Sequence, residues 1–194
     1  MHTNKYRYVF VSSHNGHLNQ NIKANLNMKR ITGVVVLLLV LVVALAAGSQ
    51  NLVFKGTDGS SVNVTSDRGK VTLLSFSATW APLASKELAA LQRIADSYSS
   101  RPVSVYWVSI NSAKQGKNFV SDSDLQAFAN RSGFSGRVLR DPDQAGYGSL
   151  GLNSIPTLVV VDKSGAVIHK HAGFDPDRPE GLSDVSQAIE RALK

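Results

Sequence analysis

The chain contains no cysteine among its 194 residues. This absence excludes disulfide bonds, thiolate catalysis, covalent haem attachment and every metal site built on cysteine. A domain without disulfide bonds depends on its hydrophobic core for stability. The roughly 145 residues after position 48 are enough to bury about two thirds of their unfolded surface, so we expect one domain with a core of its own.

Acidic residues are missing from the first quarter of the chain. Residues 1–48 carry five basic residues and no acid, whereas the rest of the chain holds 16 basic and 14 acidic residues. The globular part is therefore nearly neutral and gives no sign of a nucleic-acid partner. The basic excess lies in front of a hydrophobic run, which is typical of a signal that orients a chain in a membrane.

The hydrophobic run covers residues 31–47 and follows a basic pair. Its length, about 17 residues, is at the short end for a transmembrane helix, and Ala44-Leu45-Ala46 has the small-x-small form of a signal-peptidase site. Residues 28–48 are thus either a cleaved signal peptide or a single N-terminal membrane anchor. Both interpretations place residues 49–194 in the periplasm or another extracytoplasmic space, secreted or anchored. A lipoprotein is excluded, because no cysteine follows the run.

Residues 1–27 are rich in asparagine and histidine and show no hydrophobic periodicity. This composition predicts a disordered tail. Alternatively, Met28 is the true start, because a signal sequence normally opens with its basic residues. The three histidines of this segment form no pattern typical of metal ligands.

From residue 51 on, short apolar runs alternate with amphipathic segments. Two glycine-centred turns, at 56–59 and 68–69, predict a β-hairpin that leads into a strand. Pro82 is expected in the first turn of the helix that follows this strand, where proline is tolerated. The patterns predict, in order, strand 71–78, helix 83–100, strand 103–110, helix 121–133, a short extended piece at 137–141, hairpin 158–174 and helix 182–194.

This order of elements predicts an α/β fold. The early alternation of strands and helices favours right-handed parallel crossovers, and the late hairpin adds antiparallel strands. We therefore expect a mixed central β-sheet flanked by helices on both faces, with an N-terminal β-hairpin extension.

The segment GKVTLLSFSATWAPLASKE (69–87) resembles the strand-to-helix segment of the exported TlpA/ResA-type thiol–disulfide oxidoreductases, members of the thioredoxin-like superfamily. In that family a W-C-x-x-C-x-x-E pattern crosses the turn, and Trp80, Pro82 and Glu87 stand where the pattern places them. The stretch YGSLGLNSIPTLVVVDKSGAVIHKHAGF (147–174) resembles the family's second signature. The resemblance covers almost the whole chain from residue 51. It implies a thioredoxin-like fold with a cis peptide bond at Ile155-Pro156 facing the turn.

The departures from the family pattern decide the chemistry. Ala81 and Ala84 replace the nucleophilic and the resolving cysteine in Ala81-Pro82-Leu83-Ala84. Disulfide exchange requires a thiolate that attacks sulfur, so we expect no catalytic residue, no cofactor and no redox activity at this turn. Ser75 stands where thioredoxins proper have a buried acid, and Ser77 replaces a common aromatic residue.

The family residues that the sequence keeps around the turn and the proline loop predict a binding module. In the family, the surface around the tryptophan and the cis-proline loop receives an extended peptide, a contact that needs no sulfur. The resemblance therefore implies a peptide or protein partner in the cell envelope. It places the binding residues at Trp80, Pro82, Leu83, Ile155, Pro156 and Thr157. Alternatively, Trp80 and Pro156 are present only because the packing of strand, turn and helix needs them, and they bind no partner.

Two further interpretations stay open. The chain can be a disabled form of a thiol–disulfide oxidoreductase, active in cell redox homeostasis or cytochrome maturation, in which both cysteines have become alanine. It can also be a membrane-tethered structural or assembly partner in the cell envelope, where such relatives often work.

Two histidines near the C-terminus, His169 and His171, lie two residues apart on one face of a predicted strand. This spacing is compatible with a shared metal ion, but the sequence shows no third ligand. We therefore expect exposed histidines on an edge strand and no metal site. The acidic residues that follow other strands are expected to be turn residues: Asp141, Asp143, Asp175, Asp177 and Glu180.

Overall fold

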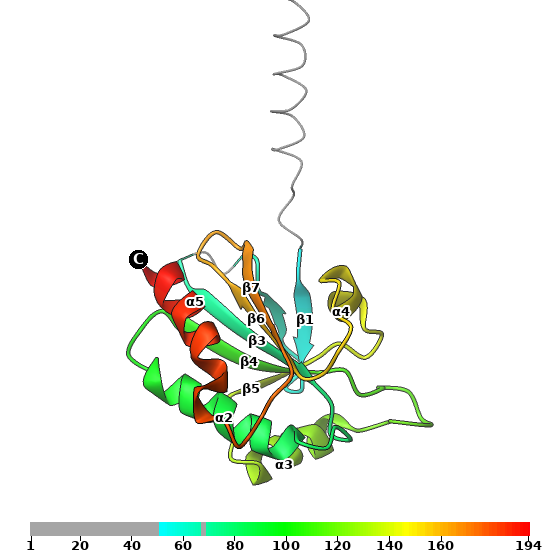
Figure 1. Ribbon diagram of the computed structural model, residues 1–194. Helices are drawn as coiled ribbons and strands as arrows, with labels where there is room; N and C mark the ends of the chain where they lie inside the picture. The colour runs from blue at the N-terminus through cyan, green and yellow to red at the C-terminus, as the bar shows by residue number, and fades with distance from the viewer. Residues whose placement is uncertain (1–50, 67–68) are drawn as a thin grey trace, which may run out of the picture. The chain divides into compact units, whose positions relative to one another are not determined.

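A seven-stranded β-sheet forms the centre of the computed structural model, which describes residues 51–66 and 69–194 (Figure 1). Across the sheet the strand order is β2-β1-β5-β4-β3-β6-β7. Along the chain the strands are β1 (Val53–Gly56), β2 (Ser61–Asn63), β3 (Val71–Ser77), β4 (Val103–Ser109), β5 (Arg137–Arg140), β6 (Thr157–Val161) and β7 (Val167–Ala172).

The pairing of the strands confirms the mixed sheet. Strands β3, β4 and β5 are parallel to one another, whereas β6 is antiparallel to β3 and β7 is antiparallel to β6. The N-terminal hairpin is also confirmed, since β1 and β2 pair antiparallel. This hairpin joins the sheet through β5, with Lys55 opposite Arg140. It therefore extends the sheet at the end opposite β7.

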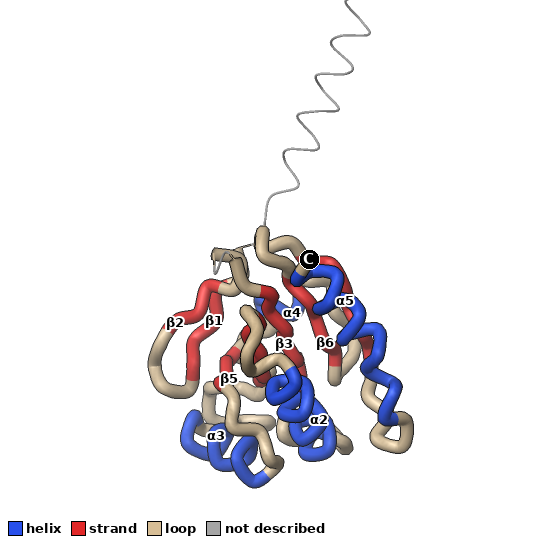
Figure 2. The backbone as a smooth tube through the Cα atoms, turned by 90° about the vertical axis from the view of Figure 1, so that its left-hand side faces the viewer, coloured by secondary structure: helices blue, strands red, loops and turns tan. Residues whose placement is uncertain are grey.

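In the described part of the chain the helices are α2 (Ala84–Ser97), α3 (Asp122–Arg131), α4 (Ala145–Ser149), the 3-10 helix η1 (Pro179–Leu182) and α5 (Ser183–Leu193). Helices α2, α3 and α5 pack on one face of the sheet and the short α4 packs on the other (Figure 2). The connections β3-α2-β4 and β4-α3-β5 advance in the same direction. Because such crossovers are right-handed, both helices lie on the same face. Helices on both faces are thus confirmed, with most of them on one.

Each face of the sheet has its own apolar core. On the face of the three longer helices, Leu73 and the fully buried Trp107 pack with Leu88 of α2. On the other face, the ring of Phe76 meets the rings of Phe54 and Tyr147 edge to face, with ring centroids 5.8 and 6.1 Å apart. Burial of both faces explains why strand β3 is buried at all seven positions.

Two local expectations are wrong. Helix α2 begins at Ala84, so Pro82 lies in the turn before the helix and not in its first turn. Helix α4 was not expected, because five residues with two glycines carry no helical periodicity. Its start is stabilised by Asp141, whose carboxylate accepts hydrogen bonds from the backbone N–H groups of Gly146 and Tyr147 at 3.1 and 2.7 Å.

The expectations for the N-terminal part lie outside the described residues. They are the tail at 1–27, the signal or anchor at 28–48 and the apolar run at 31–47. Within residues 51–66 and 69–194, none of the helices combines the length and the apolar character needed to cross a bilayer. Residues from Ser49 to Lys194 cluster as one compact unit.

Candidate functional site

Two connections meet at one end of the sheet. Strand β3 runs into the turn that carries Trp80, and strand β6 begins directly after Ile155 and Pro156. Because β3 and β6 are antiparallel, with Phe76 opposite Thr157, the end of one strand lies beside the start of the other. The peptide bond between Ile155 and Pro156 is cis, as the resemblance implies. The topology therefore brings the tryptophan turn and the cis-proline loop together.

The turn after β3 keeps a regular backbone without its sulfur atoms. The N–H of Ala81 donates to the carbonyl of Ala78 at 3.0 Å, and the N–H of Ala84 donates to the carbonyl of Ala81 at 3.1 Å. Both alanines are buried, with 7% and 2% of their surface exposed. The two methyl groups therefore fill the positions that the family gives to cysteine, and they offer no reactive atom.

The residues expected to bind a partner differ in exposure. Trp80 is 52% exposed, more than any other large hydrophobic residue in the described part of the chain. Pro82 is exposed beside it, and Leu83, Ile155 and Pro156 are half-buried. We call these five residues, Trp80, Pro82, Leu83, Ile155 and Pro156, the Trp80 surface.

Thr157, the sixth expected binding residue, is buried behind this surface. It lies opposite Phe76 of β3 on one side and Ala172 of β7 on the other. Its hydroxyl donates to the carbonyl of Ser154 at 2.6 Å, and the N–H of Gly173 donates to the carbonyl of Pro156 at 2.8 Å. Thr157 therefore supports the cis-proline loop from within the sheet.

The role of Asn111 was not predicted from the sequence. Its buried side chain accepts from the N–H of Thr79 and donates to the hydroxyl of Thr79, both at 3.0 Å. Ser109 donates to the same amide oxygen at 3.0 Å. The available signal was its position two residues after the parallel strand β4, because the ends of neighbouring parallel strands meet at one edge of the sheet.

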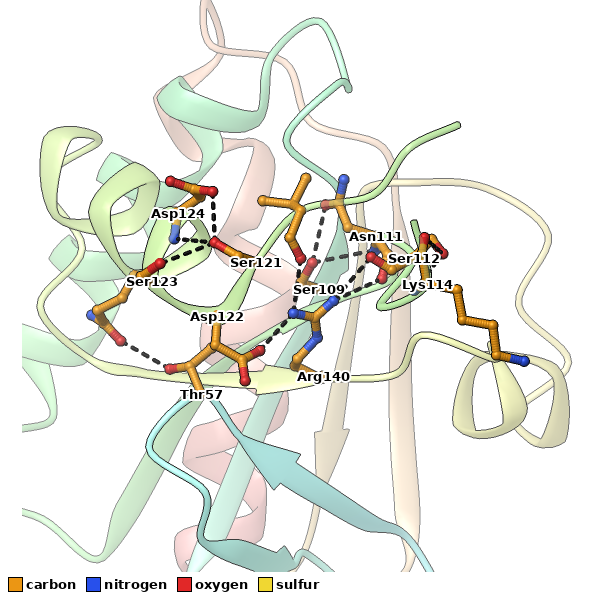
Figure 3. Close-up of polar contacts among 12 residues, drawn as sticks. Thr57, Ser109, Asn111, Ser112, Lys114, Ser121, Asp122, Ser123, Asp124 and Arg140 are labelled. Carbon is orange, nitrogen blue, oxygen red and sulfur yellow. Dashed lines mark hydrogen bonds and ion pairs between the residues drawn. The ribbon is translucent and has the colours of Figure 1, made fainter. Parts of the chain in front are cut away.

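Arg140, at the end of β5, holds the segment that follows Asn111 (Figure 3). Its guanidinium donates to the carbonyls of Asn111, Ser112 and Val120 at 3.3, 3.1 and 3.0 Å, and it pairs with Asp122 at 2.6 Å. One buried cation thus satisfies three backbone carbonyls. This network anchors Asn111, which in turn holds the turn beside Trp80.

A buried carboxyl group lies beneath the turn. Glu87 of α2 is only 2% exposed, and the hydroxyl of Ser75 donates to its Oε1 atom. Its Oε2 atom and the hydroxyl of Ser77 are buried without a hydrogen-bond partner among the described residues. Burial raises the pKa of Glu87 to about 7, even though the hydrogen bond from Ser75 favours the ionised form.

Among the residues that the structure describes, this arrangement has no group placed to act as an activated nucleophile. A serine or threonine needs an adjacent base, and the hydroxyl of Thr79 instead accepts a hydrogen bond from Asn111. The two histidines of the described residues lie on β7 and contact Asp184. No side chain caps the N-terminus of α2, although the N–H groups of Ala84 and Glu87 already donate to the carbonyls of Ala81 and Leu83.

The structure changes the interpretation of His169 and His171. Both lie on the edge strand β7, as expected, but they are half-buried and share a third residue, Asp184 of α5. The sequence could not show this contact, because Asp184 follows on a different element. The expected turn residues include Asp175, whose carboxylate pairs with Arg178 at 3.3 Å and accepts from the N–H of Asp177 at 3.0 Å.

Comparison with known proteins supports the thioredoxin-like fold. Residues 46–189 match the Redoxin family. A thiol-disulfide oxidoreductase ResA of Halalkalibacterium halodurans is 23% identical over 129 residues, which cover 66% of this chain and 69% of the relative. The ResA of Geobacillus thermodenitrificans is 23% identical over 64% of this chain and 67% of its own length.

Solved structures show the same architecture. A chain described as the thiol:disulfide interchange protein DsbE from Chlorobium tepidum superposes with a TM-score of 0.62 at 23% identity, covering 75% of this chain and 95% of that chain. The exposed lipoprotein thioredoxin of Streptococcus pneumoniae reaches 0.54 at 23% identity, covering 72% and 98%. The chain, which lacks cysteine, therefore belongs to the Redoxin family and has the thioredoxin-like fold.

Proposed function

We propose that this protein is an exported, redox-inactive binding module that holds an extended segment of a partner protein on the Trp80 surface. One observation carries the proposal: a half-exposed tryptophan lies in a turn whose two cysteine positions hold alanine, and the pairing of β3 with β6 brings this turn close to the cis-proline loop. Tryptophan is enriched among the residues that dominate binding energy at protein interfaces. Its exposure is therefore better explained by a partner than by packing alone.

The polar residues around the turn favour a preformed surface. Asn111 fixes the backbone of Thr79, and Thr157 fixes the cis-proline loop, so neither connection must be ordered when a partner arrives. A rigid surface lowers the entropic cost of binding. The partner would contact the indole of Trp80 and the side chain of Ile155, with Thr157 supporting the loop from behind.

Export is supported by residues 28–48, whose basic start and apolar run are typical of a signal peptide or an N-terminal anchor. In either form the domain acts outside the cytoplasm, where its partner would be a protein of the cell envelope. Membrane attachment follows only if the segment stays uncleaved.

The proposal is tested by peptide binding to the purified protein. Peptides are first selected on an array, and their affinities are then measured by fluorescence anisotropy. Trp80→Ala is expected to weaken binding by about 30-fold, the effect of losing roughly 2 kcal/mol at a dominant interface residue. Ile155→Asp is expected to weaken it further, because it places a charge on the apolar part of the surface.

Ile168→Asp is the matched control. Ile168 is 41% exposed, more than the half-buried Ile155, and it lies near the turn between β6 and β7, at the far end of β7 from the cis-proline loop. Its substitution is expected to leave the affinity unchanged. Equal affinity of wild type, Trp80→Ala and Ile155→Asp would refute the proposed surface.

A second candidate function is that of a thiol–disulfide oxidoreductase seen in a Cys-to-Ala disabled form. The regular turn between Ala78 and Ala84 and the cis-proline loop favour it, because the frame for exchange is retained. Restoring both cysteines distinguishes this candidate from a binding module.

A further inference from the structure

We propose that His169, His171 and Asp184 form a binding site for a divalent transition-metal ion of the zinc type, between strand β7 and helix α5. The site is separate from the Trp80 surface and uses none of its residues. It goes beyond the proposed binding function, since it assigns an ion to a different part of the molecule.

The fold brings three donor atoms together. Residues two apart on a strand project from the same face, which places both histidines of β7 toward α5. Asp184 lies in the first turn of that helix. Its Oδ2 atom is 2.8 Å from Nε2 of His169 and 2.9 Å from Nδ1 of His171. The three donor atoms all lie within 4.8 Å of one another.

The chemistry of these donors selects the kind of ion. Imidazole nitrogen suits zinc, copper and nickel, whereas magnesium and calcium prefer oxygen ligands. Two nitrogens and one carboxylate oxygen form the three-ligand set found where zinc keeps a fourth position for water. Bonds of about 2.0–2.2 Å in a tetrahedral arrangement require donor atoms roughly 3.3 Å apart. The distances from Oδ2 of Asp184 to the two nitrogens, 2.8 and 2.9 Å, would lengthen by about 0.5 Å, and the two nitrogens, which lie within 4.8 Å of each other, would settle about 3.3 Å apart.

Exposure and neighbouring charge also permit an ion. The side chains of His169, His171 and Asp184 are 25%, 22% and 44% exposed, so an ion can enter and keep a water ligand. Lys170, the residue between the histidines, donates to the carbonyl of Leu150 on the other face of the strand. Its positive charge is therefore directed away from the three donors.

The metal-free contacts use the same atoms. One carboxylate oxygen accepts from both rings only if His169 carries a proton on Nε2 and His171 carries one on Nδ1. To bind the ion through these nitrogens, each ring takes the tautomer that carries its proton on the other nitrogen, because histidine ligates a metal as the neutral imidazole. Because the donors come from the edge strand and the last helix, the ion would tie α5 to β7.

The test uses the full, tag-free chain in detergent, with Zn²⁺ as the probe. Isothermal titration calorimetry is expected to show zinc bound at this site, and zinc is expected to raise Tm. Asp184→Asn and His171→Ala should each lower the zinc affinity about 100-fold or more. Loss of a mere hydrogen-bond partner of a ligand already costs about 10- to 100-fold. The zinc-dependent rise in Tm should vanish in both variants.

Two controls separate this site from other histidines and acids. The triple variant His2→Ala, His14→Ala, His17→Ala removes the other three histidines of the chain and should keep the affinity. Asp175→Asn, in the loop between β7 and α5, should keep it too. Unchanged zinc affinity in Asp184→Asn and His171→Ala, or loss in the triple variant alone, would overturn the proposal, as would a wild type that binds no zinc.

A readout on the wild type avoids dependence on the folding of variants. Long-range ¹H–¹⁵N NMR spectra of the histidine rings should show zinc-induced shifts at Nε2 of His169 and Nδ1 of His171. Shifts confined to the N-terminal histidines would contradict the site.

Discussion

The Trp80 surface and the β7–α5 cluster of His169, His171 and Asp184 differ in two respects: their resemblance to a known sequence motif and the chemical groups that they contain. The Trp80 turn keeps the backbone of a thiol-exchange site, with its hydrogen bonds and its cis-proline, yet alanine occupies both reactive positions. The β7–α5 cluster has no recognisable sequence motif, yet it brings two imidazoles and a carboxylate into contact. A motif thus records descent, whereas chemical capacity depends on the atoms that the fold brings together.

The largest expected effect comes from giving the turn its sulfur atoms. Residues three apart in such a turn have Cα atoms less than about 7 Å apart, close to the range that a disulfide requires. We expect Ala81→Cys/Ala84→Cys to form an intramolecular disulfide and to gain thiol–disulfide exchange from none, measured by mass spectrometry and insulin reduction. Full activity would favour the disabled oxidoreductase, and weak activity a long-established binding module.

The control for this experiment is Ala81→Cys alone. It carries the only cysteine of its chain and can form no intramolecular disulfide. If the double variant also forms none under oxidising conditions, the turn no longer has the geometry for exchange. The view that the turn keeps the backbone of an exchange site and lacks only its sulfur atoms would then be wrong.

A smaller effect concerns the pH dependence of stability beneath the turn. The pKa of Glu87 rises from 4.5 to about 7 in the folded protein. The folded state therefore holds a proton that the unfolded state has lost, and stability falls as the pH rises from about 4.5 to 7. The loss amounts to roughly 3 kcal/mol. Glu87→Gln should remove this part of the pH dependence, measured by urea unfolding from pH 5 to pH 8.

Glu190→Gln provides the comparison, because Glu190 is an exposed helix residue paired with Arg101. Its unfolding curve should keep the wild-type decline in stability over this pH range. A Glu87→Gln protein whose stability declines as steeply as that of the wild type would show that the buried carboxyl is not the cause.

The smallest effect is expected in the β7–α5 cluster without metal. Burial alone would raise the pKa of Asp184, but hydrogen bonds from His171 and His169 outweigh it and hold this pKa below its usual value. Because Asp184 is 44% exposed, solvent screens the interaction. With chelator present, Asp184→Asn should therefore cost only about 0.5 kcal/mol of unfolding free energy.

Asp175→Asn, measured in the same buffer, controls for the loss of one negative charge. A cost of several kcal/mol for Asp184→Asn under these conditions would mean that the metal-free cluster itself stabilises the fold. The cluster would then differ from the Trp80 surface by its contribution to stability and not by ion binding.

Most of the fold could be predicted from sequence, because strand and helix periodicities are local. The buried strand at 71–77, the helix capped by Ser121 and the hairpin turned at 163–165 all occur as expected. Helix α4 escaped prediction, since its stability comes from Asp141 and from packing on Phe76. Such support from other elements leaves no trace in a short stretch of sequence.

For the candidate site, the sequence by itself determined the absence of sulfur at Ala81 and Ala84, and with it the loss of thiol chemistry. The sequence also indicated Trp80 and Pro156 as residues that the chain shares with the family pattern. Only the tertiary structure decided that Trp80 is exposed, that Asn111 and Arg140 hold the turn, and that Asp184 joins the two histidines. The physical reason is that composition and motifs are properties of neighbouring residues, whereas burial and ligand geometry arise from contacts between distant ones.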